Sequence, residues 1–128
     1  MSKPELEFYP AVDVAWRNVS GSDGQLKERI LSADDETGVA TRILFFSRGA
    51  DTTPLGVQVH DFWEEVYILS GEMVDLTLDQ AFTAGMYACR PPGMRHGPWR
   101  SPNGCTTFEV RYQMAPPSCS EAPRREIG

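Results

Sequence analysis

Short stretches in which apolar and polar residues alternate run along most of the chain, and glycine or proline separates them. We expect strands at residues 25–31, 39–47, 72–78, 86–90 and 105–113. The second of these carries the apolar run Ile43-Leu44-Phe45-Phe46, which is typical of a core strand. The sequence shows no internal repeat and no long helix. Many short strands between turns predict an all-β sandwich or barrel.

The two ends of the chain differ from this middle part. Residues 1–25 contain two prolines and the turn cluster of residues 20–24, so they predict an arm that carries a short strand near residues 12–16. We expect residues 26–114 to form the barrel as a single domain. Residues 115–128 contain three prolines, and we expect a mobile tail there.

Residues 55–60 predict a strand with one polar face. Side chains alternate across a strand, so Gln58 and His60 share one face and Val57 and Val59 share the other. The apolar face needs cover, which a second subunit would supply, so we expect a homodimer.

A tight connection at residues 61–63 would lead from this strand into the next one. That second strand would begin at Glu64 and end at a turn formed by Ser70 and Gly71. If the two strands pair, Glu64 lies near His60.

A second polar segment follows Gly85. It consists of the strand at residues 86–90, the stiff turn Pro91-Pro92-Gly93, and then His96. His60 and His96 are the two histidines of the chain. Two imidazoles and the Glu64 carboxylate suit non-haem Fe(II), and Mn, Ni or Zn can use the same ligands.

The spacing of these residues resembles the two sequence motifs of the cupin family. The first motif corresponds to Gln58-Val59-His60, then Glu64 after three residues and Gly71 after six more. The second motif corresponds to Gly85, Pro91, Gly93 and His96 without a gap. Residues 64–72 and 84–99 are especially similar to small cupins of the anti-sigma-factor and acetylacetone-cleaving-dioxygenase type.

The resemblance implies a double-stranded β-helix, the jelly-roll barrel of cupins, with one divalent metal ion. Its ligands would be Gln58, His60, Glu64 and His96, and Fe(II) is the favoured metal. Gln58 stands where the family has its first histidine, and an amide oxygen is a neutral and weaker ligand than imidazole. If Gln58 coordinates the metal, we expect a lower metal affinity or a changed metal preference. Alternatively, Gln58 hydrogen-bonds a bound water or substrate, and the site has three protein ligands. Thr52 and Arg100 also depart from the motifs, at turn or strand-end positions.

Several further side chains are candidates for contact with a substrate. Trp63, Trp99 and Tyr87 would border a pocket for an apolar or aromatic compound, although core packing is the ordinary role of such residues. Three arginines surround the second motif and would bind a carboxylate or enolate, unless they are merely solvated. These are Arg90, Arg95 and Arg100.

The last predicted strand adds one more candidate by its alternation. Glu109 and Arg111 share a face and are expected to form a surface ion pair. Phe108, Val110 and Tyr112 would then face the barrel interior, so Phe108 is a candidate substrate contact.

Composition narrows the classes of protein. The chain has 128 residues, 41% of them hydrophobic, which suits one domain. Its net charge of -6 argues against nucleic acid or an acidic membrane as partner. No signal sequence or membrane-length apolar run is present, so we expect a cytoplasmic protein. Cys89, Cys105 and Cys119 form no close pair and are expected to be reduced thiols.

Three functions fit a metal site that keeps coordination positions open for a small molecule. The first is a non-haem Fe(II) dioxygenase that cleaves a carbon–carbon bond in a small diketone, hydroxyketone or phenolic substrate. The second is a Lewis-acid enzyme with Zn or Mn, such as a cyclase, isomerase or hydrolase. The third is a non-catalytic sensor of a metal or small ligand.

Overall fold

Nine strands and two short 3-10 helices form the regular structure in the computed structural model, which describes residues 2–114. The strands are β1 Arg17–Asn18, β2 Leu26–Ala33, β3 Ala40–Phe46, β4 Ala50–Asp51, β5 Trp63–Asp75, β6 Gln80–Thr83, β7 Tyr87–Arg90, β8 Trp99–Ser101 and β9 Cys105–Tyr112. The helices are η1 Ala11–Asp13 and η2 Thr53–Leu55. Every strand pair is antiparallel, so the all-β prediction is confirmed.

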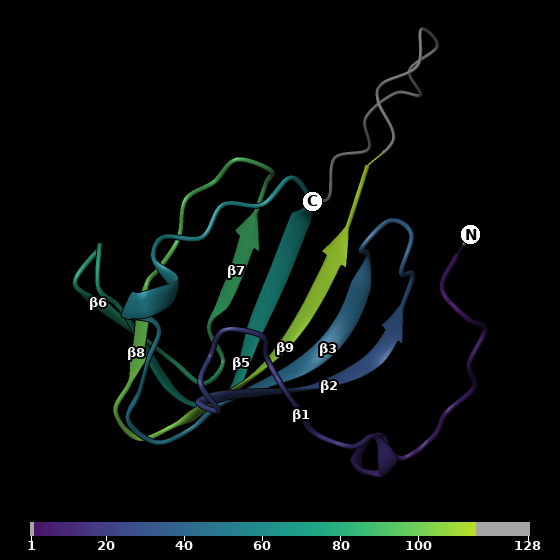
Figure 1. Ribbon diagram of the computed structural model, residues 1–128, viewed down its shortest axis with the longest axis horizontal. Coiled ribbons are helices and arrows are strands. Elements are labelled where there is room, and N and C mark those ends of the chain that lie inside the picture. The colour runs from purple at the N-terminus through teal and green to yellow at the C-terminus, as the bar shows by residue number, and fades with distance from the viewer. Residues whose placement is uncertain (1, 115–128) are drawn as a thin grey trace, which may run out of the picture.

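The strand order β1-β2-β3-β9-β5-β8-β4 curls into a barrel around β5. The first half of β5 pairs with β9 and β7, and its second half pairs with β8 and β6. Figure 1 shows β2, β3, β9, β5 and β7 as one curved sheet, with β8 and β6 beyond its edge. Apolar side chains fill one end of the interior. The buried cluster there consists of Leu26, Leu44, Phe46, Ala50, Ile68, Met73, Trp99 and Cys105.

The predicted turn at Ser70 and Gly71 is wrong, because β5 runs through both residues. The pairing of β5 with β9 shifts register between Ile68 and Ser70 and then continues to Gly71. Gly71 has a φ of +82°, and a Cβ there would collide with the carbonyl of Gly104. Glycine is therefore required for the close approach of two chain segments, and the strand predicted at residues 72–78 begins earlier as part of β5.

Residues 55–60 do not form the predicted strand. Pro54 lies in η2, and Gly56 ends that helix with a φ of +70°. The backbone then pairs with a distant loop through a single bridge, in which the Gln58 N–H donates to the His96 carbonyl at 2.7 Å. Val57 and Val59 are 39% and 51% exposed, so the homodimer expected to cover them stays a prediction.

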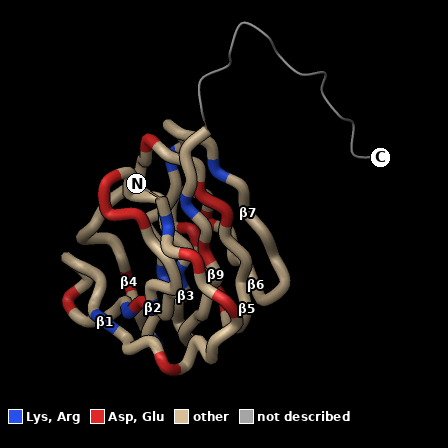
Figure 2. The backbone as a smooth tube through the Cα atoms, turned by 90° about the vertical axis from the view of Figure 1, so that its right-hand side faces the viewer, with Lys and Arg blue, Asp and Glu red and all other residues tan. Residues whose placement is uncertain are grey.

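The inner face of the curved sheet carries charge as well as apolar side chains. The prediction that Phe108, Val110 and Tyr112 face the interior is wrong, because Glu109 is 5% exposed and Phe108 is 36% exposed. In the β5–β9 register, Glu109 lies opposite Val66 and Phe108 lies opposite Tyr67, which is on the outer face. Acidic and basic residues accordingly lie close together along β3, β9 and β5 (Figure 2).

The N-terminal arm lies along the outer side of β2 and β3. Its short strand is β1, which comes after the predicted residues 12–16, and η1 takes up the first two of those residues instead. Lys3 donates a hydrogen bond to Thr41 at 2.7 Å, and the Trp16 ring packs 5.9 Å from that of Phe45. No helix in the described part of the chain is long and apolar enough to cross a membrane. The predicted tail at residues 115–128 lies outside the described residues.

Candidate metal centre

The structure brings His60, Glu64 and His96 together inside the barrel. His60 lies in the loop before β5, Glu64 is the second residue of β5, and His96 lies in the loop between β7 and β8. One ligand atom from each lies within 4.8 Å of the others. The backbone bridge between Gln58 and His96 holds the two loops together. This single backbone pairing thus joins residues from both sequence motifs.

Phe62 and Gln58 fix the surroundings of His60. The Phe62 ring stacks on the His60 imidazole with centroids 4.5 Å apart, a contact that the sequence reading missed. The Gln58 side chain lines the same cavity as the three candidate ligands. Its amide nitrogen donates to the Leu55 carbonyl at 3.0 Å, which anchors the side chain to its own loop. Coordination by Gln58 stays a prediction.

Two arginines hold the Glu64 carboxylate. Arg90 donates to its Oε1 at 3.0 Å, and Arg111 donates to its Oε2 at 3.2 Å. Both lie directly opposite Glu64 in the sheet, Arg90 on β7 and Arg111 on β9. The predicted surface ion pair between Glu109 and Arg111 is therefore wrong, because Arg111 faces the interior and pairs with Glu64. Only the strand register reveals this partnership.

The protonation states at neutral pH suit metal binding. Burial lowers the pKa of His96 to about 4, with Arg90 adding to the effect. Burial also lowers the pKa of His60, although Glu64 opposes it. Burial would raise the pKa of Glu64, but Arg111 and Arg90 outweigh it and the pKa is lowered. Two neutral imidazoles and an ionised carboxylate are the forms that bind a cation.

This donor set fits a divalent metal ion. Two imidazoles and one carboxylate are the ligands of non-haem Fe(II) sites and also serve Mn, Ni or Zn. A carboxylate has about four lone-pair sites, so Glu64 keeps acceptor capacity beyond its two arginine partners. Hydrogen bonds of this kind orient a ligating carboxylate. Arg90 and Arg111 would therefore position Glu64 for a metal.

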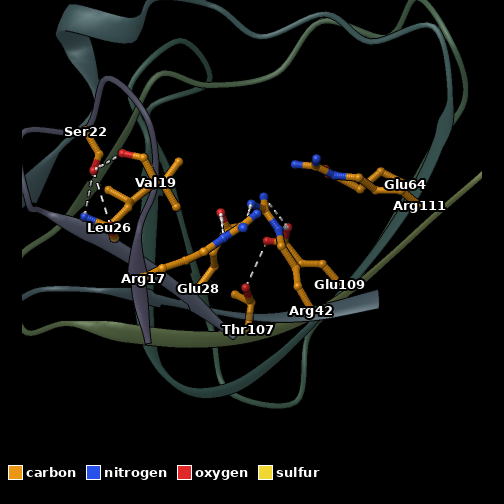
Figure 3. Close-up of polar contacts among 10 residues, drawn as sticks. All are labelled: Arg17, Val19, Ser22, Leu26, Glu28, Arg42, Glu64, Thr107, Glu109 and Arg111. Carbon is orange, nitrogen blue, oxygen red and sulfur yellow. Dashed lines mark hydrogen bonds and ion pairs between the residues drawn. The ribbon is translucent and has the colours of Figure 1, made fainter. Parts of the chain in front are cut away.

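A second charged group lies beside this one on the sheet (Figure 3). Arg42 on β3 reaches Glu28 at 2.8 Å and Glu109 at 2.8 Å, and Thr107 donates to the other oxygen of Glu109 at 2.9 Å. Burial would lower the pKa of Arg42, but the two carboxylates outweigh it and raise the pKa. We call Arg42, Glu28 and Glu109 the Arg42 cluster, and Glu64, Arg90 and Arg111 the Glu64 cluster.

Two cavities adjoin the candidate ligands. The inner cavity, of about 200 Å³, is lined by the Glu64 cluster and by Arg42, Glu109, His60 and Gln58. The outer cavity, of about 190 Å³, is mainly apolar and lies between β5, β6, β7 and the loop before β8. Five residues line both cavities, namely Val66, Met73, Arg90, His96 and Trp99.

The predicted substrate contacts divide between these cavities and other surfaces. Trp99 lines both cavities, and Tyr87 lines the outer one. Trp63, Phe108 and Arg100 line neither. The Trp63 ring instead stacks against the Tyr112 ring on β9, with the two ring centroids 6.3 Å apart. Arg100 is exposed on β8.

Comparison with known proteins agrees with this fold. A cupin from Shewanella frigidimarina has a TM-score of 0.66 and 23% identity over 87% of this chain and 93% of that one. An acetylacetone dioxygenase from Acinetobacter johnsonii has a TM-score of 0.64 and 18% identity over 84% and 72%. The polyketide cyclase RemF from Streptomyces resistomycificus has a TM-score of 0.67 and 20% identity over 88% and 83%. At these identities the likeness shows the fold.

The search of curated proteins gave no match. The family model described as ChrR cupin-like domain matches residues 8–115, which is most of the chain. The match confirms the resemblance to the anti-sigma-factor type of cupin that the two motifs indicate. The chain therefore belongs to the ChrR cupin-like family and has the single-domain cupin barrel.

Proposed function

We propose that this protein is a metal-dependent cupin enzyme, a non-haem Fe(II) dioxygenase that cleaves a carbon–carbon bond in a small diketone, hydroxyketone or phenolic compound. The observation that carries the proposal is the approach of His60, Glu64 and His96 to within 4.8 Å beside a cavity. The similar acetylacetone dioxygenase from Acinetobacter johnsonii supports this choice among cupin activities.

The residues around the site have distinct tasks in this proposal. His60, Glu64 and His96 would hold the metal, and a bound Fe(II) ion would supply the redox chemistry that dioxygen requires. Arg90 and Arg111 keep the Glu64 carboxylate in place and add positive charge next to the inner cavity. That charge favours the enolate form of a diketone over the neutral form.

A Lewis-acid enzyme with Zn or Mn is the second candidate. Gln58 favours this candidate, because the residue stands in place of a family histidine. The neutral oxygen of an amide suits a harder metal ion than imidazole does. The similar structure from Streptomyces resistomycificus also supports this candidate, because it is that of a polyketide cyclase and not of an oxygenase. Enolisation or cyclisation would then use the same arginines without consuming dioxygen.

Oxygen uptake separates these possibilities. The protein is reconstituted with Fe(II), and an oxygen electrode records uptake with acetylacetone and a panel of other β-diketones and hydroxyketones. We expect uptake that depends on both iron and substrate. Substrate conversion without uptake, best with Zn or Mn, would move the assignment to Lewis-acid chemistry. Tight metal binding without conversion of any compound would leave the sensor function.

Glu64 and Glu65 provide a matched pair of variants for this assay. They are adjacent on β5, but Glu64 is buried inside the barrel whereas Glu65 accepts a hydrogen bond from Tyr87 on the outer face. We expect Glu64→Gln to abolish oxygen uptake and Glu65→Gln to retain it. Equal activity in the two variants would contradict the site.

A further inference from the structure

The two charged clusters of the barrel interior differ in their balance of charge. In the Arg42 cluster, Glu28 and Glu109 share Arg42, and Glu28 also pairs with Arg17 at 3.4 Å, so two guanidiniums balance two carboxylates. In the Glu64 cluster, one carboxylate lies between two guanidiniums, which leaves an excess of positive charge. The side chains of Arg90 and Glu64 are 11% and 4% exposed, so water compensates this excess poorly.

A metal would enlarge the positive excess. The proposed function places a divalent cation on His60, Glu64 and His96, and Glu64 then shares its single negative charge between that cation and two arginines. Buried charge without a counterion is strongly unfavourable. The loaded site therefore favours a ligand that brings negative charge of its own.

The outer cavity indicates what else that ligand contains. Apart from the shared wall, its surface is formed mainly by hydrocarbon and thioether groups, among them Leu78, Phe82, Met86 and Met94. Leu78, Met86 and Met94 are 62%, 42% and 45% exposed, so apolar side chains surround an accessible mouth. An accessible apolar hollow of this kind suits a hydrocarbon chain.

Arg90 connects the charged site to this apolar cavity. It pairs with Glu64, it lines both cavities, and its guanidinium lies 5.1 Å from the centre of the Trp99 ring. Arg111 lines only the inner cavity. Arg95 also lines the outer cavity but is exposed, so Arg90 is the largely buried cation that a ligand in this cavity meets at its wall.

We propose that the substrate is an amphipathic oxo acid, whose carboxylate is bound by Arg90 and whose hydrocarbon chain occupies the outer cavity. The inference rests on the proposed function for the oxo group, which would face the metal ligands. Arg90, which lies over the Trp99 ring, selects the acid group, and the apolar lining selects the chain. The inference narrows the substrate from small diketones in general to compounds that carry both an ionised acid and a hydrocarbon tail.

Calorimetric titration with inert analogues tests the proposal independently of catalysis. The full-length protein, metal-free and loaded with Zn, is titrated with straight-chain alkanoates from acetate to octanoate and with the alcohols of equal length. We expect affinity to rise roughly fourfold for each added methylene, because each is removed from water. Alkanoates should bind about tenfold or more tightly than the matching alcohols, as a charge-assisted hydrogen bond predicts.

Variants locate the binding. Arg90→Gln should abolish the preference for alkanoates over alcohols, and Arg90→Lys should keep most of it. The control Arg100→Gln, at the exposed residue of β8, should keep all of it. Met94→Ser should flatten the dependence on chain length. If Arg90→Gln unfolds, as circular dichroism would show, the Arg90→Lys and Met94→Ser results still decide the matter.

Two results would overturn the inference. One is equal affinity for alkanoates and alcohols, and the other is an affinity that does not change with chain length. Neither readout needs iron or dioxygen. Alkanoate binding without oxygen uptake would therefore contradict the dioxygenase proposal alone, whereas oxygen uptake without selective alkanoate binding would contradict only the inference.

Discussion

The Arg42 cluster and the Glu64 cluster are built from the same two residue types on the same face of one sheet, yet they differ in how completely their charges are satisfied. Arg42 lies between Glu28 and Glu109, and Thr107 completes the hydrogen bonds of Glu109 (Figure 3). Glu64 instead shares its single carboxylate between two arginines and lies beside two imidazoles.

The difference separates a structural role from a functional one. A closed network with every group paired holds strands together and leaves nothing for a ligand to bind. An open cluster with excess positive charge and spare carboxylate lone pairs can accept a metal and an anion. We therefore expect substitutions in the two clusters to affect different properties of the protein.

The largest effect on stability should come from Arg42→Met. The variant leaves the buried Glu109 without a cation and Glu28 with the exposed Arg17 alone, so we expect a loss of about 3–5 kcal/mol in the free energy of unfolding. Chemical denaturation measures the loss. The control Arg100→Met removes an exposed arginine and should change stability by no more than about 0.5 kcal/mol. A loss below about 1 kcal/mol for Arg42→Met would show that the Arg42 cluster is not structural.

A smaller loss of stability is expected for Glu64→Gln. Arg111 is 25% exposed at its side chain and can turn toward water, so we expect a loss of about 1–3 kcal/mol. The same denaturation experiment compares it with Arg42→Met. If Glu64→Gln costs as much as Arg42→Met, the distinction between a closed and an open cluster is wrong.

The cysteines extend the contrast between closed and open regions. Burial, with Glu109 and Glu72 adding to it, raises the pKa of the Cys105 thiol to about 12, and the reactive thiolate is scarce below that pH. Cys89 is exposed on β7. In a Cys119→Ser background, we expect Cys89 to react with a disulfide reagent in the native protein and Cys105 to react only after unfolding, from about pH 7 to about pH 10. Equal native reactivity of both thiols would contradict the buried position of Cys105.

The smallest effect is expected for Phe108→Ala. Because Phe108 lies on the outer face, away from both cavities, the variant should bind metal with unchanged stoichiometry. Elemental analysis checks this result. Loss of metal in the folded variant would indicate that Phe108 faces the interior, as the sequence pattern predicted.

The candidate ligands could be predicted because each lies in a short segment with its own turn. Gly85, Pro91 and Gly93 fix the loop that ends at His96, and the spacing from His60 to Glu64 is equally local. Residues 55–60 show the limit of this approach, since the alternation is present but Pro54 and Gly56 prevent a strand. The side chains of Gln58 and His60 nevertheless line the same cavity.

The partners of Glu64 could not be predicted for a different reason. The usual rule that apolar side chains face inward places Phe108 inside and Arg111 outside, whereas this interior accommodates charge because each charged group finds a partner across the sheet. Arg111 lies 47 residues from Glu64 in the sequence, and no local sequence pattern predicts which residues pair at that separation. Gly71 led to the wrong prediction of a turn for a similar reason. Glycine is required at this position by the close approach of Gly104, not by a turn.

The metal site itself is tested most directly by elemental analysis of the protein purified without added metal, beside a His96→Ala variant. The account predicts about one divalent ion per chain in the wild type and its loss in a variant whose circular dichroism is unchanged. Iron would support the dioxygenase, and zinc or manganese would support Lewis-acid chemistry. Absence of metal from the wild type, even after reconstitution with each of these ions, would contradict the central claim.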